Sequence, residues 1–192
     1  MKQRIAWIGA GVLFWGIIAG LAGCASSPPL PPSPPEFTYE EEAIELYIKA
    51  DPRLNLYDGL PHTLLLCVYQ LRDPNSFHQL ADQPGGIYKL LECAPFDASV
   101  AAAKRLIVHP DQDLKYPLDR AEGARYVAVV AGYYALQKGN IIRLFDVPVV
   151  VEKPEAKGRQ PVSRPAHLTV ELNLGSERIE DRPANDAPPK TP

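Results

Sequence analysis

Apolar and polar side chains alternate along two segments of this chain with the two-residue period of a β-strand. Between residues 44 and 48, isoleucine or leucine occupies every second position, and Glu45 and Lys49 are polar neighbours. Residues 168–174 repeat the pattern, with leucine or valine at four alternate positions. Because successive side chains of a strand point to opposite faces, each segment would bury one face and expose the other. The chain is therefore expected to form sheets that pack on one side.

Five further runs are rich in β-branched, aromatic and other apolar residues, with turn-forming proline, aspartate or glycine between them. They cover residues 64–71, 104–109, 114–118, 125–134 and 141–147. Residues 126–131 are apolar on both faces, which is typical of a central strand covered on both sides. These runs raise the expected number of strands to seven or eight.

Residues 73–94 interrupt the strand pattern. Asp73-Pro74 precedes a short segment with the features of a capped helical turn, and residues 87–92 predict another turn after two glycines. We therefore expect an all-β fold, an antiparallel sandwich of two sheets with a small helical insertion at about residues 73–94.

The N-terminal segment resembles a bacterial lipoprotein signal that ends at Cys24. Lys2 and Arg4 precede a short apolar segment, and the run Leu21-Ala22-Gly23-Cys24 closes it with small residues before a thiol. The alternative is an uncleaved membrane helix, but four glycines interrupt a segment shorter than the ~20 apolar residues that a stable span prefers. We expect Cys24 to carry a covalent N-acyl diacylglycerol lipid, whose two or three chains anchor a protein stably.

The residues after the cysteine indicate where the anchored protein resides. Ala25 and Ser26 follow Cys24, without the aspartate that often retains lipoproteins on the inner membrane. The expected location is the outer membrane, with the domain facing the periplasm.

Proline and charge divide the chain into four parts. Residues 26–35 contain six prolines, so 24–39 is expected to be a lipidated linker. Within it, Ala25 to Glu36 would span up to roughly 35 Å at ~3.1 Å per residue in an extended conformation. Residues 1–23 are the expected signal peptide and 40–180 the sandwich domain. Residues 181–192 are rich in proline, charge and small side chains, and are expected to be a disordered tail.

Charge does not favour nucleic acid as a partner. The full chain has a net charge of -3, from 20 basic and 23 acidic residues. Removal of residues 1–23 takes away Lys2 and Arg4 and no acid, which leaves 18 against 23, or -5. A mature chain this acidic lacks the basic surface that binds nucleic acid.

Catalytic and metal-binding patterns are not evident in the sequence. The four histidines are scattered and form no HExxH pair. His109, Asp111 and Asp113 are spaced to bind a divalent ion, but Pro110 makes a hairpin turn the simpler interpretation. We expect no metal and no enzymatic activity. A lipoprotein hydrolase would need a clustered acid, base or metal site.

Cys67 and Cys93 are the two cysteines left once Cys24 carries lipid. An oxidising periplasm would permit a disulfide between them, linking a strand to the helical insertion. The alternative is a pair of buried thiols that pack as small hydrophobic groups, because Cys67 lies within an apolar run. The sequence leaves both interpretations open.

Several short motifs follow one another along the chain in an informative order. The phrase Val68-Tyr69-Gln70-Leu71, followed by Arg72-Asp73-Pro74 and Phe77, resembles the second-strand signature of the TssJ family, the outer-membrane lipoproteins of type VI secretion systems. Further pieces in the family's order are Leu54-Asn55, Gly59-Leu60-Pro61, Leu106 to Pro110, Arg125-Tyr126-Val127, Val129-Val130-Ala131 and Leu172 to Ile179. The chain departs from the pattern at Cys67 and Tyr134, where the family has arginine, and at Ile142-Arg143, where it has Trp-Arg.

The resemblance implies a transthyretin-like β-sandwich with a structural role. It implies a partner as well, the periplasmic C-terminal region of an inner-membrane TssM-type protein, so that the lipoprotein ties an envelope-spanning complex to the outer membrane. The runner-up function is a periplasmic ligand-binding or carrier lipoprotein, which would require an internal apolar pocket of several hundred cubic ångströms.

The loop that the family uses for partner contact corresponds here to residues 51–61. It combines backbone-restraining prolines and glycine with arginine, aliphatic and aromatic side chains of the kind enriched at binding hot spots. The alternative is an ordinary connection whose leucines fold back on the core. The expected partner-binding residues are Asp51, Pro52, Arg53, Leu54, Asn55, Leu56, Tyr57, Asp58, Gly59, Leu60 and Pro61.

Overall fold

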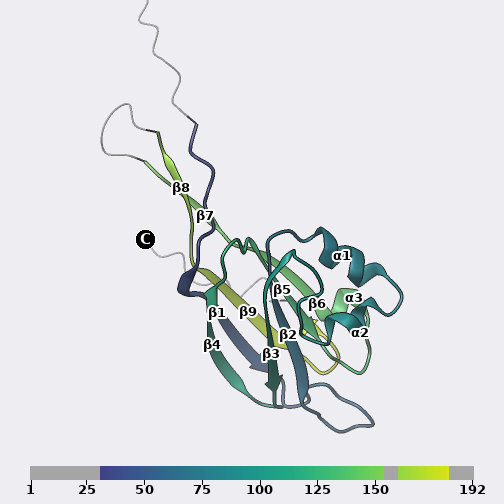
Figure 1. The fold of residues 1–192 in the computed structure, drawn as a ribbon. Coiled ribbons are helices and arrows are strands. Elements are labelled where there is room, and N and C mark those ends of the chain that lie inside the picture. The colour runs from purple at the N-terminus through teal and green to yellow at the C-terminus, as the bar shows by residue number, and fades with distance from the viewer. Residues whose placement is uncertain (1–30, 154–159, 182–192) are drawn as a thin grey trace, which may run out of the picture.

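The computed structural model describes residues 31–153 and 160–181, which form two four-stranded sheets packed face to face (Figure 1). The first sheet, in the order β10-β9-β1-β4, contains β1 (Glu40–Ala50), β4 (Asp113–Arg120), β9 (Leu168–Leu174) and β10 (Ile179–Glu180). The second, in the order β3-β2-β5-β6, contains β2 (Leu64–Leu71), β3 (Val100–Val108), β5 (Tyr126–Ala131) and β6 (Ile142–Asp146). The predicted all-β sandwich of two sheets is confirmed.

The alternating pattern in β1 places its apolar side chains between the sheets. Ile44, Leu46 and Ile48 are at most 2% exposed, while Tyr47 and Lys49 face solvent. Because β9 has the same period, its leucines and valine meet those of β1 in the main hydrophobic core. The two patterned segments therefore form neighbouring strands of one sheet.

One strand pairing differs from the antiparallel arrangement that the sequence predicts. β1 pairs with β4 in antiparallel register but with β9 in parallel register, so that Leu46 lies opposite Tyr116 on one side and Val170 on the other. β1 and β9 lie far apart in the chain, so no tight turn fixes their relative direction.

The second sheet is covered on both faces. One face of β2 and β5 packs in the main core, and the other packs beneath α1 (Asn75–Asp82) and α2 (Gly86–Leu90) in a second cluster that includes Tyr69, Phe77 and Val130. This second cover explains why β5 is apolar on both faces. The small helical insertion that the sequence predicts is present between β2 and β3.

A two-stranded ribbon projects from one end of the sandwich (Figure 1). It consists of β7 (Val149–Glu152) and β8 (Val162–Pro165), which the sequence analysis did not predict. A short helix, α3 (Lys138–Ile141), lies where the sequence predicted only a turn. None of the described helices is long and apolar enough to cross a membrane.

Candidate protein-binding surface

The loop between β1 and β2 lies at the end of the sandwich opposite the β7–β8 ribbon (Figure 1). Its first turn is held locally, because the Asp51 carboxylate accepts the Arg53 backbone N–H at 2.7 Å and the Asp51 carbonyl accepts that of Leu54 at 2.9 Å. This Asx turn fixes the entry of the loop, and the Asp51 N–H also donates to the Leu174 carbonyl of β9 at 2.9 Å. The Arg53 side chain is left exposed beside it.

The tip of the loop is a tight two-residue hairpin turn. Tyr57 and Leu60 exchange backbone hydrogen bonds of 2.9 and 3.0 Å across Asp58 and Gly59. Both central residues have positive φ, 49° and 76°, which is the conformation that an Asp-Gly pair favours. The turn presents Tyr57 and Leu60 to solvent, with 56% and 62% of their surface exposed.

The base of the loop is buried. Leu54 is fully buried in the main core and Asn55 is 5% exposed. The Asn55 side chain donates to the Thr63 carbonyl at 3.0 Å and accepts the Tyr134 backbone N–H at 3.1 Å. Of the residues expected to bind a partner, Leu54 and Asn55 therefore hold the loop in place and offer no contact surface of their own.

Three rings from two loops form a group at the surface, here called the aromatic cluster: the exposed Tyr57 and Tyr134, and the half-buried His62. The Tyr57 and Tyr134 rings stack with centroids 4.3 Å apart and planes 18° from parallel. His62 meets Tyr134 edge to face at 5.3 Å, and its Nδ1 lies 2.9 Å from the Leu60 carbonyl, as a donor in the matching tautomer. The sequence analysis did not assign His62 or Tyr134 to this site.

A surface cleft of about 280 Å³ adjoins the aromatic cluster. Its floor is fixed by two polar contacts: the Tyr133 hydroxyl donates to the Arg178 carbonyl at 2.8 Å, and the Leu56 N–H donates to the Ser176 carbonyl at 2.8 Å. Burial raises the pKa of Tyr133, so its hydroxyl stays a protonated donor at neutral pH. The cleft is lined by Asn55, Leu56, Tyr57, Tyr133, Tyr134, Ala135, Ser176 and Glu177.

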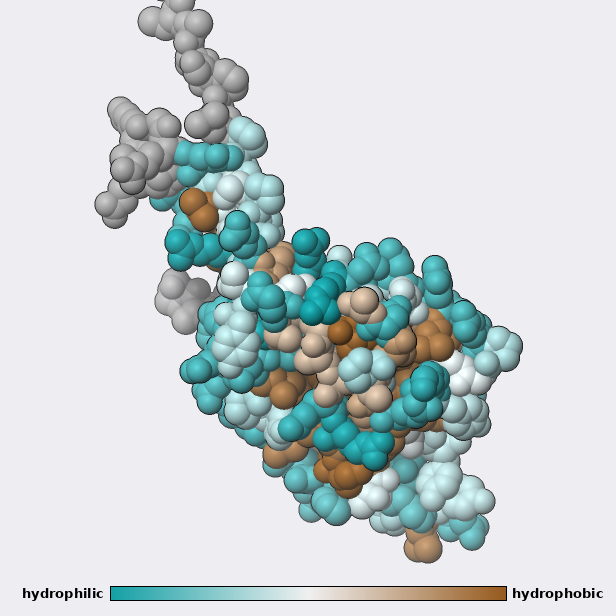
Figure 2. All heavy atoms as spheres, in the orientation of Figure 1, coloured by the Kyte–Doolittle hydropathy of each residue, from teal (hydrophilic) through white to brown (hydrophobic). Residues whose placement is uncertain are grey.

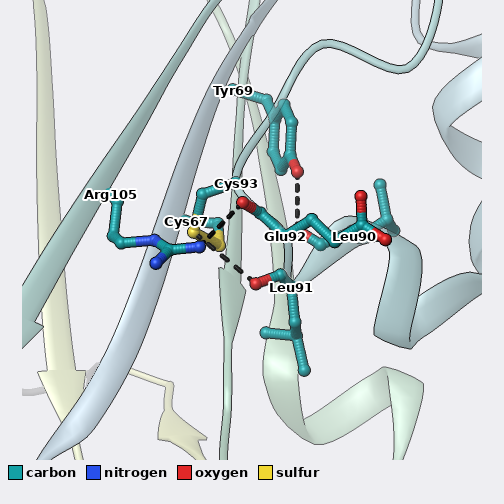
Figure 3. The surroundings of a disulfide bond; sticks show 7 residues. All are labelled: Cys67, Tyr69, Leu90, Leu91, Glu92, Cys93 and Arg105. Atoms are coloured by element: carbon teal, nitrogen blue, oxygen red, sulfur yellow. Dashed lines mark hydrogen bonds between the residues drawn. A yellow bond between two sulfur atoms is a disulfide. The ribbon is translucent and has the colours of Figure 1, made fainter.

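Cys67 and Cys93 form a disulfide with a Cα–Cα distance of 5.0 Å (Figure 3). The bond joins β2 to the residues just after α2, and Arg105 of β3 donates to the neighbouring Glu92 carbonyl at 2.9 Å. The Tyr69 hydroxyl donates to the Leu90 carbonyl at 2.5 Å on the same side of the sheet. Together these contacts fix the helical insertion on the sheet.

The remaining predicted features fall elsewhere. Cys24 lies outside the described residues. His109 and Asp111 belong to the turn between β3 and β4, where the Gln112 side chain accepts the His109 N–H at 2.9 Å, and Asp113 is the first residue of β4. Among residues 31–153 and 160–181, no three histidine, cysteine or acidic side chains are grouped as a metal site would need.

The space between the sheets is filled by side chains. Leu46 of the first sheet and Leu66 and Val129 of the second are fully buried there. A cleft of about 700 Å³ instead lies at the surface, between residues 33–40 and strand β8. A carrier function, which depends on a pocket inside the sandwich, gains no support from this arrangement.

Comparisons with known proteins place these features in context. Residues 42–174 match the family described as type VI secretion lipoprotein (VasD, EvfM, TssJ). No curated protein matches the chain.

Three solved structures are similar in fold. Lip of Serratia marcescens, described as a membrane-bound component of the type VI secretion system, is 20% identical, with a TM-score of 0.53 over 73% of this chain and 98% of that one. A chain in the structure described as the TssM C-terminal domain from EAEC is 14% identical, with a TM-score of 0.52 over 73% and 98%. TssJ1 from Pseudomonas aeruginosa is 19% identical, with a TM-score of 0.49 over 79% and 99%.

Proposed function

The chain belongs to the type VI secretion lipoprotein family that includes TssJ, and from this we propose that it anchors a type VI secretion membrane complex to the outer membrane. Its role is mechanical, because the family is a lipoprotein component of a secretion machine and not a family of enzymes. In this proposal the lipid on Cys24 fixes one end of the protein to the outer membrane. The other end binds the periplasmic C-terminal region of an inner-membrane TssM-type protein.

The observation that carries the partner-binding part is the rigid exposure of the aromatic cluster beside Leu60. Tyrosine is enriched at binding hot spots because it offers a large apolar area and a polar tip. Here Tyr57 and Tyr134 are 56% and 55% exposed although their rings stack, and Leu60 extends the apolar surface. A buried amide and a tight turn already order the loop, so a partner would lose little entropy on binding it.

A TssM-type protein is the partner that membership of the TssJ family implies. Residues Arg53 and Tyr57 lie at the exposed part of the loop and are suited to contact it. The partner surface that we propose therefore consists of the exposed residues of 51–61 together with His62 and Tyr134.

A binding measurement tests this surface. We expect Tyr57→Ala with Leu60→Ala, in the lipid-free chain from Ala25, to weaken binding to the periplasmic TssM-type domain by at least about tenfold, or ~1.4 kcal/mol. Tyr88→Ala is the matched control, since Tyr88 is 70% exposed on α2, outside the proposed surface. Both proteins should keep the wild-type melting temperature. Unchanged affinity of the double variant would move the interface to another part of the sandwich.

A second experiment tests the anchor. Cys24→Ser removes the thiol that the lipid requires, so the protein should fold, leave the membrane fraction and fail to support secretion. Ala25→Ser is the control that leaves the thiol in place. Normal secretion by a Cys24→Ser protein that is fully soluble would contradict the anchoring role.

A further inference from the structure

The β7–β8 ribbon exposes valines without an evident packing role. Val149, Val150 and Val151 are 42%, 48% and 52% exposed, and Val162 on the opposite strand is 41% exposed. Figure 2 shows the ribbon standing apart from the body of the molecule, mostly hydrophilic on the face turned to the viewer and with one small hydrophobic spot there. A two-stranded ribbon is marginal in water by itself, so exposed valines along it call for a partner or a surface.

The ribbon is joined to the segment that leads back to the lipid anchor. Ser33 pairs with Val162 as a parallel bridge, and its N–H donates to the Pro161 carbonyl at 2.9 Å. The Gln160 side chain donates to the Pro31 carbonyl, also at 2.9 Å. Since β8 runs from the free end of the ribbon toward the sandwich, its parallel neighbour runs the same way. The described part of the chain therefore begins at the free end of the ribbon, at Pro31, and runs from there toward the sandwich.

The distance to the anchor is limited by the chain itself. Seven peptide units separate Cys24 from Pro31, and at 3.3–3.6 Å per residue they span at most about 25 Å. The eleven residues of β1 extend roughly 36 Å toward the opposite end. A lipid on Cys24 thus keeps the ribbon near the bilayer, and the aromatic cluster can lie far from it.

The two faces of the ribbon differ in polarity. Val149 and Val151 share a face with their cross-strand partners Pro165 and Ser163, because paired side chains point to the same side and alternate along the strand. The other face carries Val150, Val162 and an ion pair between Arg164 and Glu152, at 3.4 Å. One face is therefore uncharged, whereas the other carries both charges, as in an element that lies at a membrane interface.

We propose that the β7–β8 ribbon is a second, direct contact with the phospholipid bilayer that holds the Cys24 lipid. The face with Val149 and Val151 enters the boundary between headgroups and acyl chains, and Arg164 stays at the level of the phosphates. This inference rests on the lipid anchor of the proposed function. Its consequence is orientation: an anchor at one cysteine leaves the sandwich free to tilt, whereas two contacts direct the aromatic cluster away from the membrane.

Site-specific fluorescence on the lipidated protein tests the contact. The chain has three cysteines, of which Cys24 would carry lipid and the other two are bonded, so Val151→Cys introduces one reactive thiol. An NBD label at this position is measured in vesicles of phosphatidylethanolamine and phosphatidylglycerol that contain a headgroup-level nitroxide lipid. We expect a blue-shifted emission and at least a twofold loss of intensity by quenching. The matched control is Leu60→Cys, whose label should stay unquenched at the opposite end.

Flotation of the same samples separates the two hypotheses. Protein that floats with the vesicles while the Val151 label is quenched no more than the Leu60 label overturns the ribbon contact and leaves the anchor intact. Protein that does not float refutes the anchor, and the ribbon contact with it. A blue shift at Val151 without quenching by lipid overturns the contact as well and assigns the ribbon to a protein partner or a second copy of the chain.

Discussion

Asn55 is the residue on which the geometry of the proposed binding surface depends. Its amide links two loops, by donating to the Thr63 carbonyl at 3.0 Å and accepting the Tyr134 N–H at 3.1 Å. Its backbone has a φ of 48°, a left-handed conformation that asparagine tolerates better than most residues. Asn55→Ala removes both hydrogen bonds. It also forces alanine into the left-handed conformation, without the side-chain amide that helps asparagine to adopt it.

The expected loss of stability follows from these two effects. Each hydrogen bond contributes about 0.5–1.5 kcal/mol net, so the pair accounts for about 1–3 kcal/mol. The left-handed conformation costs alanine about another 1 kcal/mol. Asn55→Ala should therefore lower the free energy of unfolding by about 2–4 kcal/mol. For a chain of this length that is a fall in melting temperature of roughly 4–16 °C.

Asn55→Gly separates the two contributions, because glycine loses the same hydrogen bonds and adopts a positive φ without strain. Urea unfolding of both variants should show the glycine variant more stable than the alanine variant by about 1 kcal/mol. Equal stability of the two would refute the argument from backbone strain. A loss below about 0.5 kcal/mol in both variants would refute the role of the amide.

Three further predictions concern the rest of the sandwich. Replacing Cys67 and Cys93 by serine should lower the free energy of unfolding by about 3–4 kcal/mol, the chain-entropy value for a loop closed across 26 positions. If reductant does not change the unfolding midpoint of the wild-type protein, this prediction is wrong. Burial raises the pKa of Tyr69 to about 12, so the contribution of this tyrosine to stability is complete below about pH 10 and is lost as the pH rises toward 12. In urea titrations, the free energy of unfolding of Tyr69→Phe should therefore depend less on pH over that interval than that of the wild type. Arg120 is buried beside Glu40, and Arg120→Met should destabilise less than Glu40→Gln, which leaves the guanidinium without its countercharge; thermal unfolding that gives the reverse order would refute this.

The parts of the fold that sequence predicts are those in which one strand face is buried. β1 and β9 were found from alternation alone, because burial on one side and solvent on the other impose a period of two. β5 was found from the opposite signal, continuous apolar character, because α1 and α2 cover the outer face of its sheet. In both cases a local pattern reflects the layers around the strand.

The β7–β8 ribbon has no such signal. All four residues of β7 are exposed and three of them are valines, so no alternation of apolar and polar residues marks it as a strand. Val162 pairs with Glu152 of β7 and also with Ser33, which lies far away in the chain and inside a proline-rich segment that the sequence assigns to a linker. Pairing over such a separation depends on the finished fold and leaves no periodicity in either segment. The parallel pairing of β1 with β9 escapes prediction for the same reason.

The binding surface was predictable only in part. Its position at 51–61 came from the resemblance to a family, and the Asp-Gly turn at its tip was visible in the sequence. The sequence does not predict that Leu54 and Asn55 point inward, because their burial depends on contacts with residues as distant as Tyr134, 79 positions from Asn55. Because of the same separation, the sequence does not place Tyr134 at the binding surface, although this residue departs from the family pattern.

A single strand, β1, links the segment that leads to the anchor with the binding loop, and this link determines how the protein would transmit force. β1 begins at Glu40, next to the segment that leads to the anchor, and ends at Ala50, next to the binding loop. Tension between membrane and partner would therefore run along β1 itself. Because β1 is hydrogen-bonded to β4 on one side and β9 on the other, a pull along its axis loads those hydrogen bonds together, in shear, and not one after another. A central strand with two bonded neighbours is thus well placed to transmit force without unfolding the sandwich.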